Sequence, residues 1–221
     1  MNFLALATVC FFGFGDCSSI TVAPTGEREL RPPTSGIRLG SLYYVREKPT
    51  ENISKPANLI KLCTTRLDRH GIVPEVQRVA DIDLLEKLEG SAALDGVKSQ
   101  FVQLGLNGSL TNYFTYKLTN VTRSDISRVE ADRILNVRGE ENDCADWRDS
   151  MRGQNWGVYQ IAAISVGDIQ FARNTDIGGG GDVKINLVKL EPSLKASLKK
   201  VTGLAFSGKG LVISFQPILR N

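Results

Sequence analysis

The sequence predicts an α+β fold with a mainly antiparallel sheet and a few short helices grouped in the middle of the chain. Three observations support this prediction: β-rich runs occupy both ends of the chain, helical patterns gather between them, and strands and helices do not alternate regularly. Regular alternation is typical of a parallel sheet, whereas strands grouped apart from helices are typical of the α+β class.

Two strands are expected early in the chain. Residues 37–47 alternate apolar and polar side chains and end shortly before Pro49, which predicts a half-buried strand. Residues 58–67 predict a second strand, which carries Cys63.

The clearest local signal is the Asn107-Gly108 pair, which lies between two β-rich runs within residues 99–121. Asn-Gly fits a two-residue turn in which both central residues adopt positive φ angles. The sequence therefore predicts a β-hairpin across 99–121.

Helical patterns fill the middle of the chain. The first helix is expected to begin at Asp81 and to end before Gly90, since these residue types favour the two ends of a helix. The other two predicted helices cover residues 124–135, opened by Ser124, and residues 143–151.

The C-terminal third returns to strands. Four are predicted, at residues 157–166, 169–172, 183–190 and 211–216. A helix is expected between the last two, over residues 191–203, with Pro192 in its first turn and Gly203 at its end.

The N-terminus is predicted to be an export signal covering residues 1–19. The 13 residues from Phe3 to Gly15 carry no charge, which matches the apolar region of a signal peptide and is too short to span a bilayer. No Lys or Arg precedes Arg28, so the positive charge typical of such signals is missing. The alternative is a buried N-terminal strand or helix.

Two fates are open for Cys17: lipid attachment after cleavage, or removal with a signal that is cleaved after Ser19. Asp16 is an unfavourable neighbour for a lipidation site. Residues 20–36 are rich in Pro, Thr and Gly and predict a flexible linker. Residues 37–221 are then expected to form a single domain.

The cysteines predict one disulfide. If Cys10 is removed with the leader, and Cys17 is removed or acylated, Cys63 and Cys144 remain. In an oxidising compartment this pair is expected to form a bridge. The alternatives are two unrelated buried thiols or a catalytic cysteine.

Catalytic and metal-binding motifs are scarce. His70 is the single histidine and, with two available cysteines, does not supply zinc-ligand spacing. A nucleophilic Cys63–His70 pair is conceivable from the sequence, but a solvated loop histidine is the simpler interpretation. The glycine run within 175–185 is followed by Asp182 instead of Lys-Ser/Thr, so it predicts a loop rather than a phosphate site.

An acidic segment lies at residues 140–149. It supplies paired carboxylates for a secreted hydrolase, or else forms a solvated helix face balanced by nearby arginines. Its acidic residues are Glu140, Glu141, Asp143, Asp146 and Asp149.

The net charge of +3 and the lack of a basic stripe argue against nucleic-acid binding. The expected function is that of an exported, non-enzymatic binding or assembly protein without a cofactor. It would be periplasmic, secreted or anchored to a membrane by lipid, with an envelope or extracellular protein as partner. Besides the hydrolase, the alternative is a membrane-inserting, pore-forming protein that uses the alternating run Val183, Ile185, Leu187 with Lys195, Lys199 and Lys200.

Overall fold

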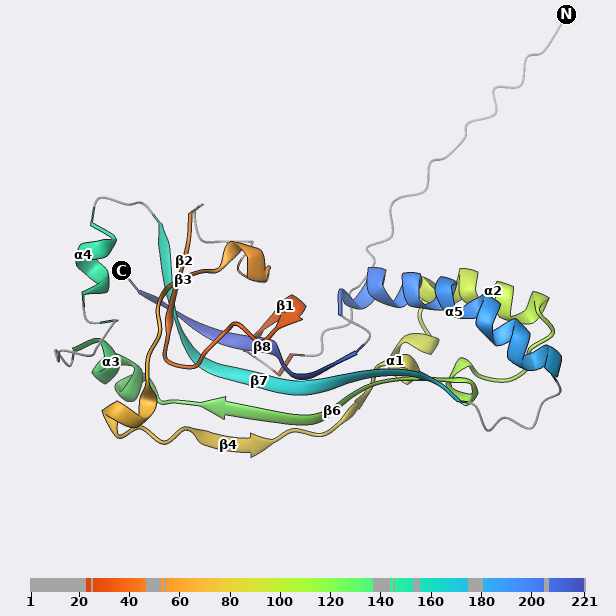
Figure 1. The fold of residues 1–221 in the computed structure, drawn as a ribbon, viewed down its shortest axis with the longest axis horizontal. Helices are drawn as coiled ribbons and strands as arrows, with labels where there is room; N and C mark the ends of the chain where they lie inside the picture. Colours follow the sequence, from red (N-terminus) through yellow and green to blue (C-terminus); the bar gives the residue numbers. More distant parts are fainter. Residues whose placement is uncertain are drawn as a thin grey trace, which may run out of the picture.

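The chain folds around one eight-stranded antiparallel sheet with helices packed at both ends (Figure 1). The structure is a computed structural model. It describes residues 23, 24, 26–46, 53, 55–136, 144, 146–152, 156–174, 181–204 and 207–220. The predicted α+β class with a mainly antiparallel sheet is confirmed. The export signal at 1–19 and the proposed lipidation site Cys17 lie outside the described residues.

Three long strands form the centre of the sheet: β6 (Phe114–Asp125), β7 (Gly157–Arg173) and β8 (Ser207–Arg220). The strand β7 pairs along one side with β8. The order on the main path is β1-β8-β7-β2-β3, and β6 pairs with β4, β5 and β7. The shorter strands are β1 (Arg28–Thr34), β2 (Leu42–Val45), β3 (Ile60–Cys63), β4 (Glu75–Arg78) and β5 (Ile82–Asp83).

The other side of β7 is divided between two partners. Residues 157–160 pair with β2, and residues 163–173 pair with β6. On this side of β7, the sheet therefore continues into β2 at one end and into β6 at the other. A separate hydrophobic core forms at each end of the molecule.

At one end, three helices cover the sheet: α1 (Leu84–Glu89), α2 (Asp95–Gln103) and α5 (Gly181–Thr202). Figure 1 shows α2 and α5 next to each other beside the long strands. The helix α5 buries leucines three or four residues apart, as expected for one face of a helix. These are Leu187, Leu190, Leu194 and Leu198. We call this half of the molecule the helix-covered end.

The other end is made of short elements around a disulfide. Cys63 and Cys144 are bonded, with their Cα atoms 5.3 Å apart, so the predicted bridge is confirmed. Around the bridge lie β1, β2, β3 and two helices, α3 (Arg128–Asn136) and α4 (Trp147–Ser150). We call this half the disulfide end.

The strand predicted at 183–190 is wrong, because these residues form the first half of α5. Val183, Ile185 and Leu187 alternate over a short run, but Leu187 begins the longer helical series of buried leucines. Pro192 lies inside this helix instead of in its first turn, and α5 lies outside the mid-chain group of helices.

The predicted hairpin at 99–121 is also wrong. Residues 99–103 belong to α2, in which Val97 and Phe101 are four residues apart and both buried. Gly108 does adopt a positive φ of 92°, but it lies in a loop before β6 and not in a two-residue turn.

The linker predicted at 20–36 is wrong over residues 28–34. These residues form β1, which pairs with β8, although Pro32 and Pro33 cannot donate hydrogen bonds to a sheet. The position of β1 at the end of the main path explains how the prolines are accommodated, since an edge strand needs partners on one side only.

The other predicted strands and helices correspond to elements of the structure, with different boundaries. The strands expected at 157–166 and 169–172 are continuous in β7, and the first predicted helix begins at Leu84, with Asp83 as its N-cap. Within the described part of the chain, no helix is long and apolar enough to cross a membrane.

Candidate functional site

The best-built polar site is a buried carboxylate on the sheet. The Glu27 side chain is 1% exposed and belongs to the segment predicted as linker. One carboxylate oxygen accepts a hydrogen bond from Nε of Arg123 at 2.8 Å. The other accepts from the hydroxyls of Ser165 at 2.7 Å and Ser214 at 2.6 Å. A single side chain therefore connects the N-terminal segment to β6, β7 and β8.

Arg123 is held between two carboxylates. Its Nη1 lies 3.0 Å from a carboxylate oxygen of Asp125, in addition to the contact with Glu27. Burial alone would lower the pKa of Arg123, but the hydrogen bonds to Glu27 and Asp125 outweigh that effect and raise it. The guanidinium therefore stays charged, as a buried carboxylate requires of its partner.

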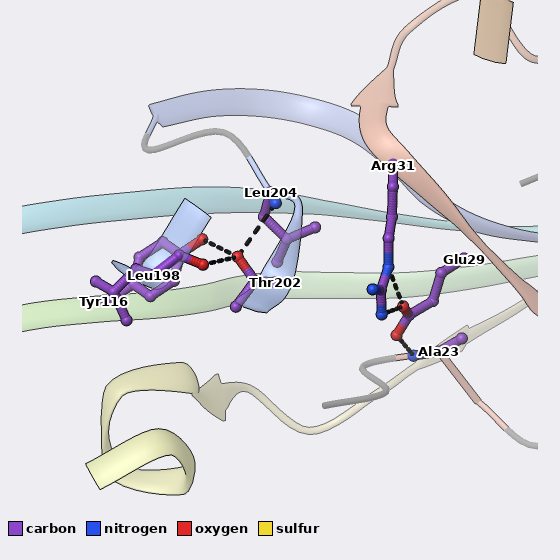
Figure 2. A network of polar contacts seen from close by, with 7 residues as sticks. All are labelled: Ala23, Glu29, Arg31, Tyr116, Leu198, Thr202 and Leu204. Carbon is purple, nitrogen blue, oxygen red and sulfur yellow. Dashed lines mark hydrogen bonds and ion pairs between the residues drawn. The ribbon is translucent and has the colours of Figure 1, made fainter. Parts of the chain in front are cut away.

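A second carboxylate, Glu29, orders the same segment. It accepts a hydrogen bond from the backbone N–H of Ala23 at 3.2 Å and pairs with Arg31 (Figure 2). The side chain of Arg31 packs against Gly203, where a Cβ would come within 3.1 Å of it. Since Gly203 directly follows α5, the first described residues are fixed beside the C-terminal end of that helix.

The end of α5 is itself held by a hydrogen-bonded threonine (Figure 2). The Thr202 hydroxyl donates to the carbonyl of Leu198 at 2.8 Å and accepts from the N–H of Leu204 at 3.1 Å. Because its one hydrogen is used, the hydroxyl of Tyr116, 3.2 Å away, must donate to it. Burial raises the pKa of Tyr116, which keeps that hydroxyl protonated.

The chemistry of the Glu27 site is that of an anchor and not of a catalytic centre. Each carboxylate oxygen accepts at least one hydrogen bond, and both serine hydroxyls direct their hydrogens at Glu27. A serine nucleophile would instead need a free base and access for a substrate. We therefore assign these four residues to the attachment of the N-terminal segment.

Among the described residues, β4 pairs with β6 alone, so its other side is an open edge of the sheet. All four residues of this strand are exposed, and Val76 keeps 63% of its surface. The N–H of Val79 donates to Val121, so alternate residues of β4 face β6 and the backbone groups of Val76 and Arg78 point away from it. Val73, just before this strand, is 86% exposed.

The second open surface is the outward face of α5. Ile185 and Val188 are each 54% exposed there, and Val102 on the neighbouring helix α2 is 70% exposed. The two helices are joined by a hydrogen bond from Asn186 to the carbonyl of Leu104. Four exposed lysines share this face: Lys184, Lys189, Lys199 and Lys200.

Two of the candidate catalytic residues are not in a position to act together. Cys63 is bonded to Cys144, so it is not available as a thiolate nucleophile for His70. His70 ends a short 3-10 helix, Leu67–His70, and is half-buried. The hypothesis of a catalytic Cys63–His70 pair is therefore wrong.

The acidic segment is described only in part. Asp149 is exposed and forms an ion pair with Arg152 at 2.7 Å, as expected for a solvated helix face. Asp146 immediately precedes α4. The remaining acidic residues, Glu140, Glu141 and Asp143, lie outside the described residues, as do most residues of the glycine run within 175–185.

Among the described residues, no group of three or more His, Cys, Asp and Glu side chains is arranged to hold a metal ion. Comparison with known proteins adds no assignment, since no protein-family model and no curated protein matches the chain.

No sequence pattern indicates the Glu27 site. Its four residues are spread over most of the chain, and each is of a type that is common on protein surfaces. They are Glu27, Arg123, Ser165 and Ser214. Only the pairing of β6, β7 and β8 brings their side chains to one place.

Proposed function

We propose that this chain is an exported, non-enzymatic binding or assembly protein of the cell envelope or the extracellular space. The observation that carries the proposal is the disulfide between Cys63 and Cys144, both of which are buried. Disulfides of this kind persist in oxidising compartments and are rare in the cytosol. The apolar run Phe3–Gly15 supplies the matching export signal.

The ordered N-terminal segment supports attachment of the domain close to a membrane. Glu27 and Glu29 fix the chain from Ala23 onward to the folded domain. If Cys17 carries a lipid, five residues separate it from Ala23, and the six steps along the backbone span at most about 20 Å. The domain would then be held near the surface instead of hanging from a long linker.

The open edge of β4 is the surface that we propose for binding a partner protein. An extended segment that adds to this edge would satisfy the backbone groups of Val76 and Arg78 and would cover Val73 and Val76. Strand addition needs no catalytic residue, which agrees with the anchoring role that we assign to Glu27.

The two alternative functions have less support. The hydrolase would need carboxylates that face each other across a substrate, whereas Asp149 is paired with Arg152 on an exposed helix. The pore-forming alternative depended on a strand with Val183, Ile185 and Leu187 on one side. These residues are in a helix, and Leu187 is 2% exposed.

Cell fractionation with mass spectrometry of the mature N-terminus tests export and anchoring. We expect the mature chain to begin at Cys17 or within about five residues after it. The variant Cys17→Ser is the matched control, because it removes a lipid but leaves simple cleavage possible. An intact Met1 on a cytosolic protein with reduced Cys63 and Cys144 would refute the proposal.

Site-specific photo-crosslinking tests the β4 edge. A photoreactive residue at position 76 should capture an envelope or extracellular protein in intact cells. The same residue at Val129, which is 78% exposed on α3, serves as the control. Equal crosslinking at both positions, or none at position 76, would exclude the edge as the binding surface.

A further inference from the structure

The outward face of α5 combines exposed apolar side chains with lysines along the whole helix. At 100° per residue, Ile185, Val188, Pro192 and Ala196 form a strip, and Lys184 and Lys189 lie on its two sides. Lys199 and Lys200 continue the basic charge toward the C-terminal end of the helix. We propose that this face rests on an anionic lipid surface, with the helix parallel to the membrane plane.

The charge on this face is not neutralised by the helix itself. Its acidic residues are Asp182 in the first turn and Glu191, which pairs with Lys195 at 2.7 Å and lies 3.7 Å from Arg173. None of the four exposed lysines forms an ion pair with a described residue. Their charge is therefore available to lipid phosphates, which attract basic residues near a membrane surface.

The arrangement of side chains suits the membrane interface. An interfacial helix places its apolar strip among the acyl chains while lysines extend their ammonium groups to the headgroups. Ile185 and Val188 each expose 54% of their surface, so they have area to bury. The opposite side of α5 packs on the sheet through its leucines, so this helix would lie on the membrane and not insert across it.

The position of the N-terminal segment agrees with this orientation. Arg31 packs against Gly203 at the end of α5, and Glu29 connects Arg31 to Ala23 (Figure 2). A lipid on Cys17 would be tied to the domain within about 20 Å of Ala23. The anchor and the lysines would then act on the same surface, and one lipid chain with a basic patch gives the two signals that stable membrane attachment requires.

This inference depends partly on the proposed function, because the anchor assumes export. The lysine face is tested separately with the purified chain carrying Cys17→Ser, so that no lipid contributes. The measurement is co-sedimentation with vesicles of phosphatidylcholine containing phosphatidylglycerol, compared with phosphatidylcholine alone. We expect binding only to the anionic vesicles, weakened by salt.

The decisive variant replaces Lys184, Lys189, Lys199 and Lys200 by Gln. At about a fivefold loss for each lysine, binding should fall by more than about 100-fold. The matched control replaces four exposed lysines outside α5, namely Lys55, Lys61, Lys87 and Lys209. Both variants change the net charge equally, and the control should bind within a few-fold of the parent.

A third variant, Ile185→Ser with Val188→Ser, separates insertion from charge attraction. It should weaken binding while preserving its salt dependence. Circular dichroism and the intact disulfide verify that each variant is folded.

Three outcomes would overturn the inference: no binding of the parent chain to anionic vesicles, equal binding to neutral vesicles, or equal loss in both lysine variants. The last outcome would mean a non-specific effect of net charge. Export of a chain that fails these tests would leave the proposed function intact. Binding by a chain that is found in the cytosol would refute the proposed function alone.

Discussion

The two ends of the molecule bury similar apolar side chains by different means. The helix-covered end uses regular helices, of which α5 alone supplies four buried leucines across one face of the sheet. The disulfide end uses two strands and one helix of four residues each, namely β2, β3 and α4. Short elements offer few packing contacts of their own, and the covalent bridge between Cys63 and Cys144 compensates for this.

The buried polar groups differ in the same way. At the helix-covered end, the hydroxyl pair Tyr116–Thr202 closes the end of one helix. At the disulfide end, the amide of Gln160 donates to the carbonyls of Gly40 and Ala131 and accepts from Arg220. One side chain thereby joins three segments that lack regular pairing with one another. The side-chain link at the disulfide end thus joins several irregular segments, whereas the link at the helix-covered end secures a single helix.

Loss of the disulfide should have the largest effect on stability. The bridge spans 81 residues, and the chain-entropy model assigns it about 4.5 kcal/mol. Reduction should therefore lower the midpoint of thermal unfolding by about 10–15 °C. Amide hydrogen exchange should rise first in β2 and β3 while α5 remains protected.

The double variant Cys63→Ser with Cys144→Ser is the control for this experiment, since its unfolding should not respond to reductant. If reduction accelerated exchange equally in α5 and in β2, the two ends would not differ in the way described.

The variant Glu27→Gln should cost about 3 kcal/mol of unfolding free energy. It removes the charge that accepts from Arg123, Ser165 and Ser214 in a site that is 1% exposed. Chemical denaturation gives the free energy, and limited proteolysis before β1 reports release of the N-terminal segment. Glu75→Gln on the exposed strand β4 is the matched control, for which a change below about 0.5 kcal/mol is expected. Equal effects of the two variants would contradict the anchoring role.

Much of the sheet and the disulfide could be predicted from the sequence, for identifiable reasons. The long strands β7 and β8 each contain a β-rich run that the sequence analysis identified, and the bridge followed from counting cysteines under the assumption of export. The strand predicted at 183–190 failed because period two and period three-to-four patterns coincide over a few residues. Only the leucines beyond Pro192 distinguish them.

The N-terminal segment could not be predicted because its stability is not local. Pro32 and Pro33 weaken the strand pattern of this segment. A strand that contains them is acceptable only at an edge position, such as the one beside β8. The partners of Glu27 come from three strands that lie 96 to 187 residues further along the chain. No local pattern encodes contacts of that kind.

Two helix caps, one at each end, test whether the sheet couples the two cores. The Asp83 side chain accepts from the N–H of Glu86 and caps α1. Ser127 and Glu130 form a reciprocal capping box at α3, in which each side chain accepts from the backbone N–H of the other residue. Asp83→Ala and Ser127→Ala should each cost about 1 kcal/mol.

The two cap variants are compared by their unfolding curves. If the long strands make the molecule a single cooperative unit, both cap variants shift one transition by the same amount in circular dichroism and in tryptophan fluorescence. Trp147 lies at the disulfide end, so tryptophan fluorescence reports unfolding of that end. If Ser127→Ala shifted the fluorescence transition and Asp83→Ala did not, the two ends would unfold separately.

The smallest expected effect is a pH dependence at the bulge between β6 and β7. There Asp168 accepts from the side-chain amide of Asn120 at 2.9 Å and from the N–H of Gly210 at 2.8 Å. These two hydrogen bonds lower the pKa of Asp168 from its ordinary value.

A carboxyl whose pKa is lower in the folded than in the unfolded chain stabilises the fold above the unfolded-state pKa, near pH 4. This stability is lost as the pH falls through the folded-state pKa. Asp168→Asn should therefore slightly reduce stability at pH 7 and leave stability unchanged at a pH well below the folded pKa. Urea unfolding of the parent and the variant at pH 7 and at about pH 2 measures the difference. A cost that is the same at both pH values would show that the carboxylate charge does not stabilise the bulge.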